Sequence, residues 1–495
     1  MMMKKLRNIS ALVVCLLMFQ ACSEDFLNKK LLGNLTQDTF FMTQDHAIQS
    51  VNAIYAKFRS WELAGLPYIG ATDVISDDSD KGSTENDALY LKEIDDFLFD
   101  ATNQTFSTMW TGHYQTIARA NLAILNIPNI DMDESLRARL VGEAKFLRAF
   151  CYFRMVQWFG EIPIISEPLT EDEYFTQVRQ PVAQVYDFIE KDLQDAIASL
   201  PEKSKYPASE LGRATKGAAK GILAKLYMLE QKYPEALALC EEVISSGEYS
   251  LVSQYNTIFT QAQENGVESV FEIGAVALQA AVVGPGASPY NMVQGVRGIP
   301  NLGWGFNRPS DDLVASYEPG DPRRQATVIY VGEVLPDGVT IVQDNPDIFN
   351  ERFNQKAWVP SHPGLQDNGP GNIRLLRYAD VLLIAAEAAN EAGNSAKALE
   401  YVNMIRKRAR GNNNFILKDL TITNQAELRT AIRKERRVEL AMEQLRWFDL
   451  KRWGIQNETL TKVGKTFVNN KHELFPIPQT EVDLTDGGLV QNPGY

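Results

Sequence analysis

Two stretches of this sequence, residues 221–244 and 383–406, align with each other without gaps at an offset of 162 residues. Each reads as a helix, a tight turn and a second helix. Small residues such as Ala224 and Ala386 stand where two helices must approach closely. The pattern is typical of a tetratricopeptide helical hairpin, although any pair of amphipathic helices would align in a similar way. Because the two copies are not contiguous, we expect helical hairpins inside a larger fold and not a simple solenoid.

Apolar residues recur with helical spacing on both sides of the middle of the chain. The expected helices cover residues 43–61, 106–126, 133–159, 181–200, 215–231 and 234–246 before the middle, and 378–392, 395–410 and 425–453 after it. Residues 72–87 and 474–495 read as loops.

The middle of the chain, about residues 251–372, has a different pattern. Helical spacing fades there, and Gly and Pro become frequent. Short strand-like runs stand at residues 269–273, 327–331 and 340–342. Long irregular inserts on a rigid scaffold usually carry function. We therefore predict a mainly α fold, in which a tetratricopeptide-like helical scaffold, about residues 22–250 and 373–495, holds an irregular ligand-facing insert with short β strands.

Residues 1–21 have the features of a targeting segment. Basic residues at its start precede an apolar stretch, residues 9–19, that is too short to span a bilayer as a helix. A small residue, Ala21, stands directly before Cys22, as at the cleavage site of a bacterial lipoprotein signal. We expect cleavage before Cys22 and lipid on its sulfur and new α-amino group, which would anchor the protein. A plain secretory signal with an incidental cysteine is the alternative.

Composition and missing motifs exclude several functions. Lys and Arg total 49 and Asp and Glu total 63, and the net charge of −14 argues against a general nucleic-acid binder, which needs cationic surface. The four histidines show no zinc-ligand spacing, and there is no P-loop, dinucleotide or nucleophile-elbow motif. Cys151 and Cys240 lie in helical apolar patterns, so we expect buried free thiols rather than a disulfide. We expect no cofactor and no enzyme.

Acidic residues crowd the segment 72–87, where Asp73, Asp77 and Asp78 are the candidates for ligand contact. Carboxylates of this kind could accept hydrogen bonds from ligand hydroxyls, bind calcium, or supply the pair that a glycosidase requires. Their spacing does not follow that of an EF-hand loop, which weakens the calcium hypothesis. A solvated loop without a ligand is the remaining interpretation.

Aromatic residues in the loops are the second candidate site. Trp304 stands between two glycines in the irregular middle, with Tyr290 and Phe306 close by in the sequence, and Trp61 and Tyr68 flank the acidic segment. Flat aromatic faces stack on the apolar faces of sugar rings, while nearby polar groups bind the hydroxyls. We expect Trp304 and Tyr290 to be stacking platforms. The alternative for each is a place in the core.

The basic run at residues 429–437 could indicate an anion-binding patch. Glutamates interleave with the arginines at helical spacing, so we expect ion pairs within the helix instead.

Six segments spread over the mature chain carry a family pattern. They are CSEDFL at residues 22–27, WTGHYQTIARAN at 110–121, GEAKFLRAFCYFRMVQWFGEIP at 142–163, GRATKGAAKGILAKLYM at 212–228, RYADVLLIAAE at 377–387 and ERRVELAMEQLRWFDLKRW at 435–453, with LFPIPQTEVDL and QNPGY closing the chain. Their order and spacing resemble the SusD/RagB family of Bacteroidetes outer-membrane lipoproteins. The acidic run after Cys22 also resembles the surface-export signal of such lipoproteins.

The resemblance implies a protein that binds an oligosaccharide, or in some members a peptide, at the outer cell surface. It implies no catalysis. We expect no metal site, although calcium at the acidic loop stays open. The partner that the resemblance implies is a SusC-like TonB-dependent transporter, on which the protein would act as a lid. It also implies that the acidic loop and the Gly-Trp-Gly turn face the ligand. Two other interpretations stay open from the residues alone, a surface glycoside hydrolase that uses the acidic loop and a helical-repeat scaffold that binds only protein.

Overall fold

The structure is a computed structural model that describes residues 40–276, 286–299, 301–335, 337–343, 347–348, 350–360, 369–485 and 487–495. The expected signal segment and Cys22 lie outside these residues. Over the described ranges, no helix is both long and apolar enough to cross a membrane.

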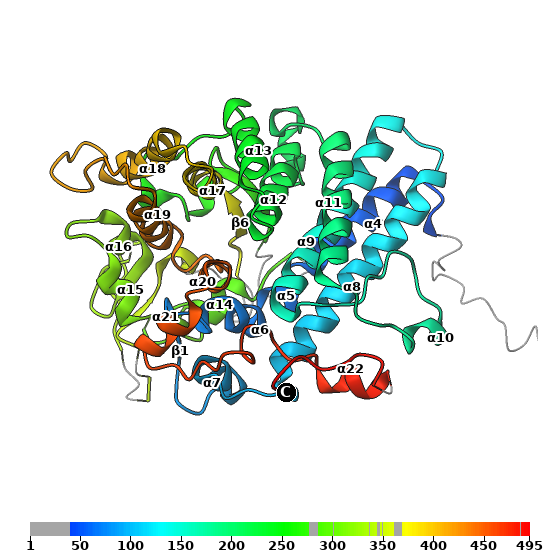
Figure 1. Cartoon of the computed structure of the whole chain (residues 1–495), viewed down its shortest axis with the longest axis horizontal. Helices are drawn as coiled ribbons and strands as arrows, with labels where there is room; N and C mark the ends of the chain where they lie inside the picture. The colour runs from blue at the N-terminus through cyan, green and yellow to red at the C-terminus, as the bar shows by residue number, and fades with distance from the viewer. Residues whose placement is uncertain are drawn as a thin grey trace, which may run out of the picture.

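Helices form most of the molecule, and the prediction of a mainly α fold is confirmed (Figure 1). The long helices are α4 (Gln44–Lys57), α8 (Gln104–Asn126), α9 (Glu134–Phe159), α11 (Val182–Ser199), α12 (Lys216–Leu229), α13 (Tyr233–Ser245), α17 (Tyr378–Glu391), α18 (Ser395–Arg410) and α19 (Gln425–Leu440). Most of them begin where a side chain can cap the free N–H groups of the first turn. Asp133, for example, accepts from the Leu136 N–H at 2.8 Å, and Thr215 accepts from the Ala218 N–H at 3.1 Å.

The two aligned stretches of sequence are helical hairpins that lie side by side. The first is α12 with α13 and the second is α17 with α18, and α13 packs against α17 (Figure 1). Ala224 and Ala386 are fully buried, as close helix contact requires. The hairpin prediction is therefore confirmed, although the copies are neighbours in space and not in sequence. The expectation of two buried free thiols, Cys151 and Cys240, is confirmed as well.

The insert consists of short elements that pair with one another and with the scaffold. Its helices and the strands of the protein are α14 (Tyr290–Gln294), α15 (Asp311–Ser316), α16 (Pro322–Thr327), β1 (Ser79–Gly82), β2 (Ser269–Ile273), β3 (Phe306–Pro309), β4 (Val328–Tyr330), β5 (Arg352–Asn354) and β6 (Ile373–Arg377). They form three antiparallel two-stranded sheets, β1–β3, β2–β6 and β4–β5. The expected strand at residues 340–342 is wrong, because Thr340 and Val342 make only isolated bridges.

The segment before α8 is a second difference from the sequence prediction. Instead of an exposed polar loop, residues 72–87 follow α5 (Trp61–Ala64) and α6 (Leu66–Ile69) as a π-helical turn and then strand β1. Strand β1 pairs with β3, so Ser79 lies opposite Pro309 and Gly82 opposite Phe306. Helix α7 (Leu89–Asp96) follows. This pairing brings the acidic segment beside the insert.

The single helix expected at residues 425–453 is wrong. Helix α19 ends at Leu440, and α20 (Arg446–Trp453) begins after a turn. In this turn Met442 and Gln444 have φ values of 62° and 58°, a left-handed conformation that is uncommon for residues other than glycine. Helix α21 (Gln456–Lys462) follows, and α22 (Gln479–Leu484) lies where the sequence predicted only a loop.

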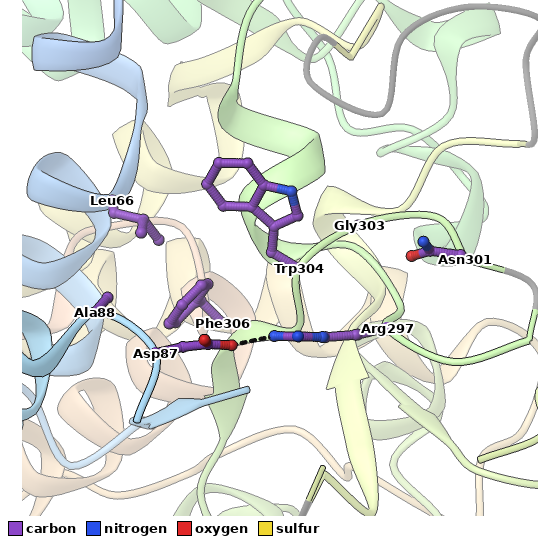
Figure 2. A pocket seen from close by; sticks show the side chains of 8 residues that line it. All are labelled: Leu66, Asp87, Ala88, Arg297, Asn301, Gly303, Trp304 and Phe306. Atoms are coloured by element: carbon purple, nitrogen blue, oxygen red, sulfur yellow. Dashed lines mark hydrogen bonds and ion pairs between the residues drawn. The ribbon is translucent and has the colours of Figure 1, made fainter. Parts of the chain in front are cut away.

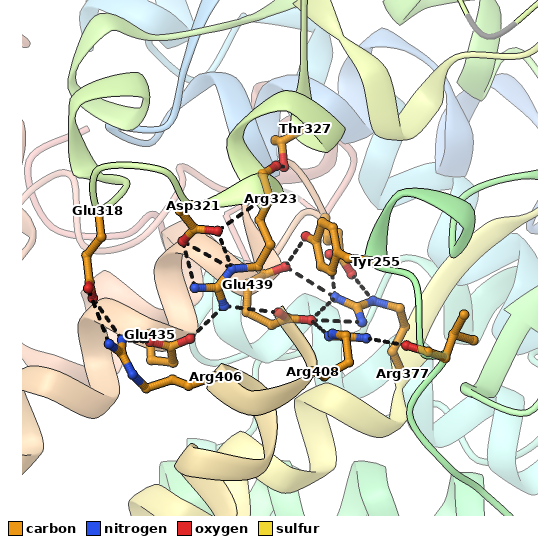
Figure 3. Close-up of polar contacts among 12 residues, drawn as sticks. Tyr255, Glu318, Asp321, Arg323, Thr327, Arg377, Arg406, Arg408, Glu435 and Glu439 are labelled. Atoms are coloured by element: carbon orange, nitrogen blue, oxygen red, sulfur yellow. Dashed lines mark hydrogen bonds and ion pairs between the residues drawn. The ribbon is translucent and has the colours of Figure 1, made fainter. Parts of the chain in front are cut away.

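A buried network of ion pairs joins the insert to the scaffold (Figure 3). At its centre Glu439 of α19 contacts Arg323 of α16 at 3.2 Å, Arg377 of β6 at 3.3 Å, and Arg408 of α18. All four side chains are at most 3% exposed. The Glu439 carboxylate of α19 thus forms ion pairs with three other elements, α16, β6 and α18.

The basic residues of α19 also differ from the prediction. Their ion pairs run to other elements and not to glutamates of the same helix. Arg429 pairs with Glu391, Arg436 with Asp380 and Asp449, and Arg437 with Asp77, Asp78 and Asp312. The helix is therefore a connector between distant parts of the chain.

Candidate functional site

The Gly-Trp-Gly turn holds Trp304 by its backbone. The turn connects α14 to β3, and the Trp304 N–H donates to the Met292 carbonyl at 2.8 Å while the Gly305 N–H donates to the Gly295 carbonyl at 2.9 Å. A Cβ atom at Gly303 would lie 2.3 Å from the Met292 oxygen, so only glycine fits there. Gly305 has a φ of +75°, which glycine adopts readily. The two glycines seen in the sequence therefore fix the position of the indole.

We expect Gly303→Ala to displace this turn. The new methyl group would overlap a backbone oxygen, so the segment must shift, at a cost of about 1–3 kcal/mol in the free energy of unfolding. Urea denaturation measures this loss. Gly274→Ala is the matched control, because its Cβ would meet its nearest neighbour at an ordinary 3.9 Å. Equal stability of the two variants would contradict the expected overlap.

A cavity of about 420 Å³ opens beside Trp304 (Figure 2). It is lined by Leu66, Asp87, Ala88, Arg297, Asn301, Gly303, Trp304 and Phe306. The residues come from α6, from the chain that leads into α7, from the turn between α14 and β3, and from the first residue of β3. A volume of this size is within the range of small-molecule sites in proteins. Aromatic rings and polar groups share its wall.

An ion pair forms the polar part of the cavity. Arg297 pairs with Asp87, and the Arg297 guanidinium also donates to the Ser83 hydroxyl at 2.6 Å. Burial raises the pKa of Asp87, but hydrogen bonds from Arg297, Thr84 and Ser83 outweigh it, so the pKa lies below its ordinary value. Both side chains remain about one third exposed, at 31% and 38%. They can therefore exchange hydrogen bonds with a ligand.

A second tryptophan adjoins the cavity. Trp61 begins α5, is 38% exposed, and lies with its ring centroid 5.9 Å from that of Trp304 at an interplanar angle of 53°. Gly65 makes room for it, since a Cβ there would lie 2.7 Å from the Trp61 ring. The two indoles form an angled aromatic surface at the rim, a shape suited to a curved ligand chain.

Asp73 and Tyr290 lie in the interior and not in the cavity wall. Asp73 accepts hydrogen bonds from the backbone N–H and the side-chain amide of Gln444, at 3.0 and 2.7 Å, and from the Asn307 amide at 2.9 Å. The Tyr290 hydroxyl donates to the Gln444 side chain at 2.9 Å. These bonds hold the left-handed turn between α19 and α20. In this structure the two residues hold the backbone next to the cavity and do not line it. Their predicted contact with a ligand stays a prediction.

The ionisation of Asp73 predicts a pH-dependent stability. Burial raises its pKa to about 6 in the folded protein, above its ordinary value of 3.8. A carboxyl group whose pKa is higher in the folded than in the unfolded protein adds to the free energy of unfolding at pH values below the pKa of the unfolded state. This stabilisation is lost as the pH rises through 6. Relative to Asp73→Asn, the wild type should lose roughly 2 kcal/mol between pH 4 and 7. Denaturation of both proteins at several pH values measures the difference, and a constant difference would contradict the prediction.

Asp77 and Asp78 are also buried, each 1% exposed. Arg446 binds both oxygens of Asp77 at 2.8 Å, and Arg437 bonds to Asp78 at 2.7 Å. Burial raises the pKa of Asp77, but Arg446 and Arg437 hold it below its ordinary range. The carboxylates neutralise arginines from two helices, Arg437 of α19 and Arg446 of α20, which lie 359 and 369 residues further along the chain. They are occupied by these partners, so we carry only Trp304 forward from the sequence-based candidates.

The cavity can bind but is poorly equipped to catalyse. Among the described residues of its lining, Asp87 is the single carboxylate, whereas glycoside hydrolysis requires two on opposite sides of the bond. No group of three metal-ligating side chains occurs in the described ranges.

The sequence analysis did not identify Asp87, Arg297 and Asn301 as site residues. Only the aromatic residues gave a signal in the sequence from which this site could be predicted.

Comparison with known proteins identifies the family. Residues 287–495 match the model of the SusD family, and residues 25–228 match that of proteins described as "Starch-binding associating with outer membrane". A SusD-like protein P2 of Formosa agariphila is 30% identical over 98% of both chains. A laminarin-binding SusD-like protein of known structure is 29% identical and superposes with a TM-score of 0.79, covering 92% of this chain and all of that one. The surface glycan-binding protein A of Bacteroides fluxus is 25% identical, with a TM-score of 0.76 and the same coverage. The chain belongs to the SusD family.

Proposed function

We propose that this protein captures an oligosaccharide at the cell surface and delivers it to a SusC-like TonB-dependent transporter in the outer membrane. The observation that carries the proposal is the cavity beside Trp304, where an aromatic face stands over an ion pair with free hydrogen-bonding capacity. Sugar rings need this combination, because their C–H faces stack on indole while their hydroxyls bind charged groups.

Each part of the cavity has a role in this proposal. Trp304 packs against the apolar face of one sugar unit, while Phe306, which is only 4% exposed, closes the cavity beside it. Trp61 carries the next unit at the rim. Asp87 accepts hydrogen bonds from ligand hydroxyls, and Arg297 donates to ring or hydroxyl oxygens. Laminarin is the first ligand to test, since a relative of 29% identity is a laminarin-binding protein.

Capture without conversion is the second part of the proposal. A lone carboxylate that is already paired with Arg297 cannot act as both acid and base, so bound glycan would leave intact. Lipid on Cys22 would hold the protein on the outer membrane, with its body facing the outside. The family description that associates such proteins with the outer membrane supports this location.

Native affinity electrophoresis tests the proposal. The mature chain with Cys22→Ser, which carries no lipid, is run in gels that contain single polysaccharides, laminarin included. Retardation by at least one glycan is the expected result, with no shortening of that glycan after long incubation. Cleavage would establish a hydrolase. Failure of every glycan to retard the protein would contradict glycan capture, and co-purification with the transporter separately tests delivery.

A further inference from the structure

Arg154 is buried without an acidic partner among the residues that the structure describes. Arg154 lies in the last third of α9 and is 3% exposed. Its guanidinium stacks on the rings of Phe150 and Phe448, 5.4 and 4.7 Å from their centroids. Among the described residues, no carboxylate lies within ion-pairing distance of it, and its Nε atom is buried without a hydrogen-bond partner. A buried, unpaired charge strongly destabilises a fold unless something compensates it.

A small cavity lies against this guanidinium. Its volume is about 30 Å³, and its lining includes the cationic residues Arg154, Lys225, Arg436 and Arg452, with Asp449 as the one acidic residue among them. The helices α9, α12, α19 and α20 supply these five side chains. A water molecule needs roughly 10–15 Å³ of such volume, so the space admits one or two waters or one monoatomic ion. A sulfate, a carboxylic acid or a sugar does not fit.

The charges around this cavity do not balance. Three of the four cations alternate with three carboxylates in one chain of ion pairs, Lys225–Asp380–Arg436–Asp449–Arg452–Glu387. These six charges cancel. Arg154 is the seventh and leaves one positive charge in excess. Burial lowers the pKa of Arg154, and the weaker opposing effects of Tyr68 and Asp380 do not offset it.

We propose that this cavity is a binding site for one monoatomic anion, with chloride as the natural ligand. A chloride ion fits the volume, cancels the excess charge, and accepts hydrogen bonds from guanidinium and ammonium groups. Water could fill the space but would leave the charge uncompensated. The ion would link α9 and α12 of the N-terminal half to α19 and α20 of the C-terminal half. The proposal does not depend on glycan binding.

Bromide is the probe for a direct test, because it replaces chloride and scatters X-rays anomalously. Crystals of the lipid-free mature chain grown with sodium bromide in place of chloride should show an anomalous peak in this cavity. Density for water alone, without an anomalous peak at high bromide, would overturn the proposal. This measurement uses the wild-type protein and so does not depend on a variant that folds.

A variant tests the part of Arg154. In Arg154→Met an unbranched apolar side chain keeps part of the packing against the two aromatic rings but loses the guanidinium and its charge. The bromide peak should disappear. Arg433→Met is the matched control, because Arg433 also stacks on an aromatic ring, 4.8 Å from the centroid of Trp453, and does not line the cavity. A peak that persists in Arg154→Met, or that is lost equally in the control, would contradict the assignment.

Thermal unfolding gives an independent readout in solution. At equal ionic strength, replacing sodium gluconate by sodium chloride should raise the Tm of the wild type saturably, by on the order of 2 °C, because gluconate is too large for the cavity. Arg154→Met should show no such rise, and Arg433→Met should behave as the wild type. An equal rise in all three proteins would locate the salt effect elsewhere and refute the site.

Discussion

Replacing Glu439 by glutamine is expected to lower the free energy of unfolding by roughly 3–5 kcal/mol, the usual loss when one partner of a buried ion pair is removed. The Glu439 carboxylate is fully buried and lies against Arg323, Arg377 and Arg408. Burial alone would raise its pKa, but these guanidinium groups hold it at about 2. Glutamine keeps the shape of the side chain, yet it removes the negative charge and turns an amide N–H₂ toward cationic donors. Urea denaturation at pH 7 measures the loss.

The control for this variant is an ion pair at the surface. Asp419 pairs with Arg410 at 2.5 Å, but the Asp419 side chain is 55% exposed. Exposed pairs contribute at most about 1 kcal/mol, so Asp419→Asn should change stability little. If Glu439→Gln were no more destabilising than Asp419→Asn, the network in Figure 3 would not be what joins the insert to the scaffold.

The fold could be predicted from the sequence where its signals are local. Helices such as α9 and α18 are specified by signals within a few residues, namely apolar spacing and a capping side chain such as Asp133. The break between α19 and α20 has no local signal of this kind. It depends on Asp73, about 370 residues away, which binds the backbone and side chain of Gln444. No pattern near Gln444 indicates this partner.

The burial of the acidic segment could not be predicted from the sequence for a related reason. Clustered aspartates in a stretch of low helical periodicity usually indicate a solvated or ligand-binding loop, and composition alone gives no other prediction. Asp77 and Asp78 are instead neutralised by Arg437 and Arg446 from the C-terminal half. The sequence did contain these arginines, but the pairing is set by the packing of β1 and β3 beside α19. Charge patterns predict ion pairs well only when both partners lie on one element.

The aromatic part of the candidate site could be predicted from the sequence, whereas its ion pair could not. Trp304 stood out because the two glycines beside it give its ring little cover, and the structure places it at the cavity wall. Asp87 and Arg297 are 210 residues apart and meet only because β1 pairs with β3. A side chain that a local turn presents can be found in a sequence, whereas a pair that the tertiary fold assembles requires coordinates.

Replacing Trp304 by alanine is expected to weaken glycan binding by about 2 kcal/mol, or roughly 30-fold in Kd. The variant removes the largest aromatic face of the cavity and leaves the Asp87–Arg297 pair in place, so hydrogen bonding to hydroxyls remains while stacking is lost. Trp304→Phe keeps a smaller ring and should retain part of the affinity. Trp61→Ala should lose less than Trp304→Ala, since Trp61 lies at the rim. Affinity electrophoresis and calorimetry with the glycan that retards the wild type measure these changes.

The control for Trp304→Ala is Phe415→Ala, which removes an aromatic side chain that is 93% exposed and belongs to the loop between α18 and α19. Its affinity should equal that of the wild type. An unfolded variant would also lose binding, so the Tm of each protein is measured alongside, and Trp304→Ala should remain folded. Unchanged glycan affinity in a folded Trp304→Ala protein would move the binding site away from this cavity, because Phe306, the other aromatic residue of its described lining, is only 4% exposed.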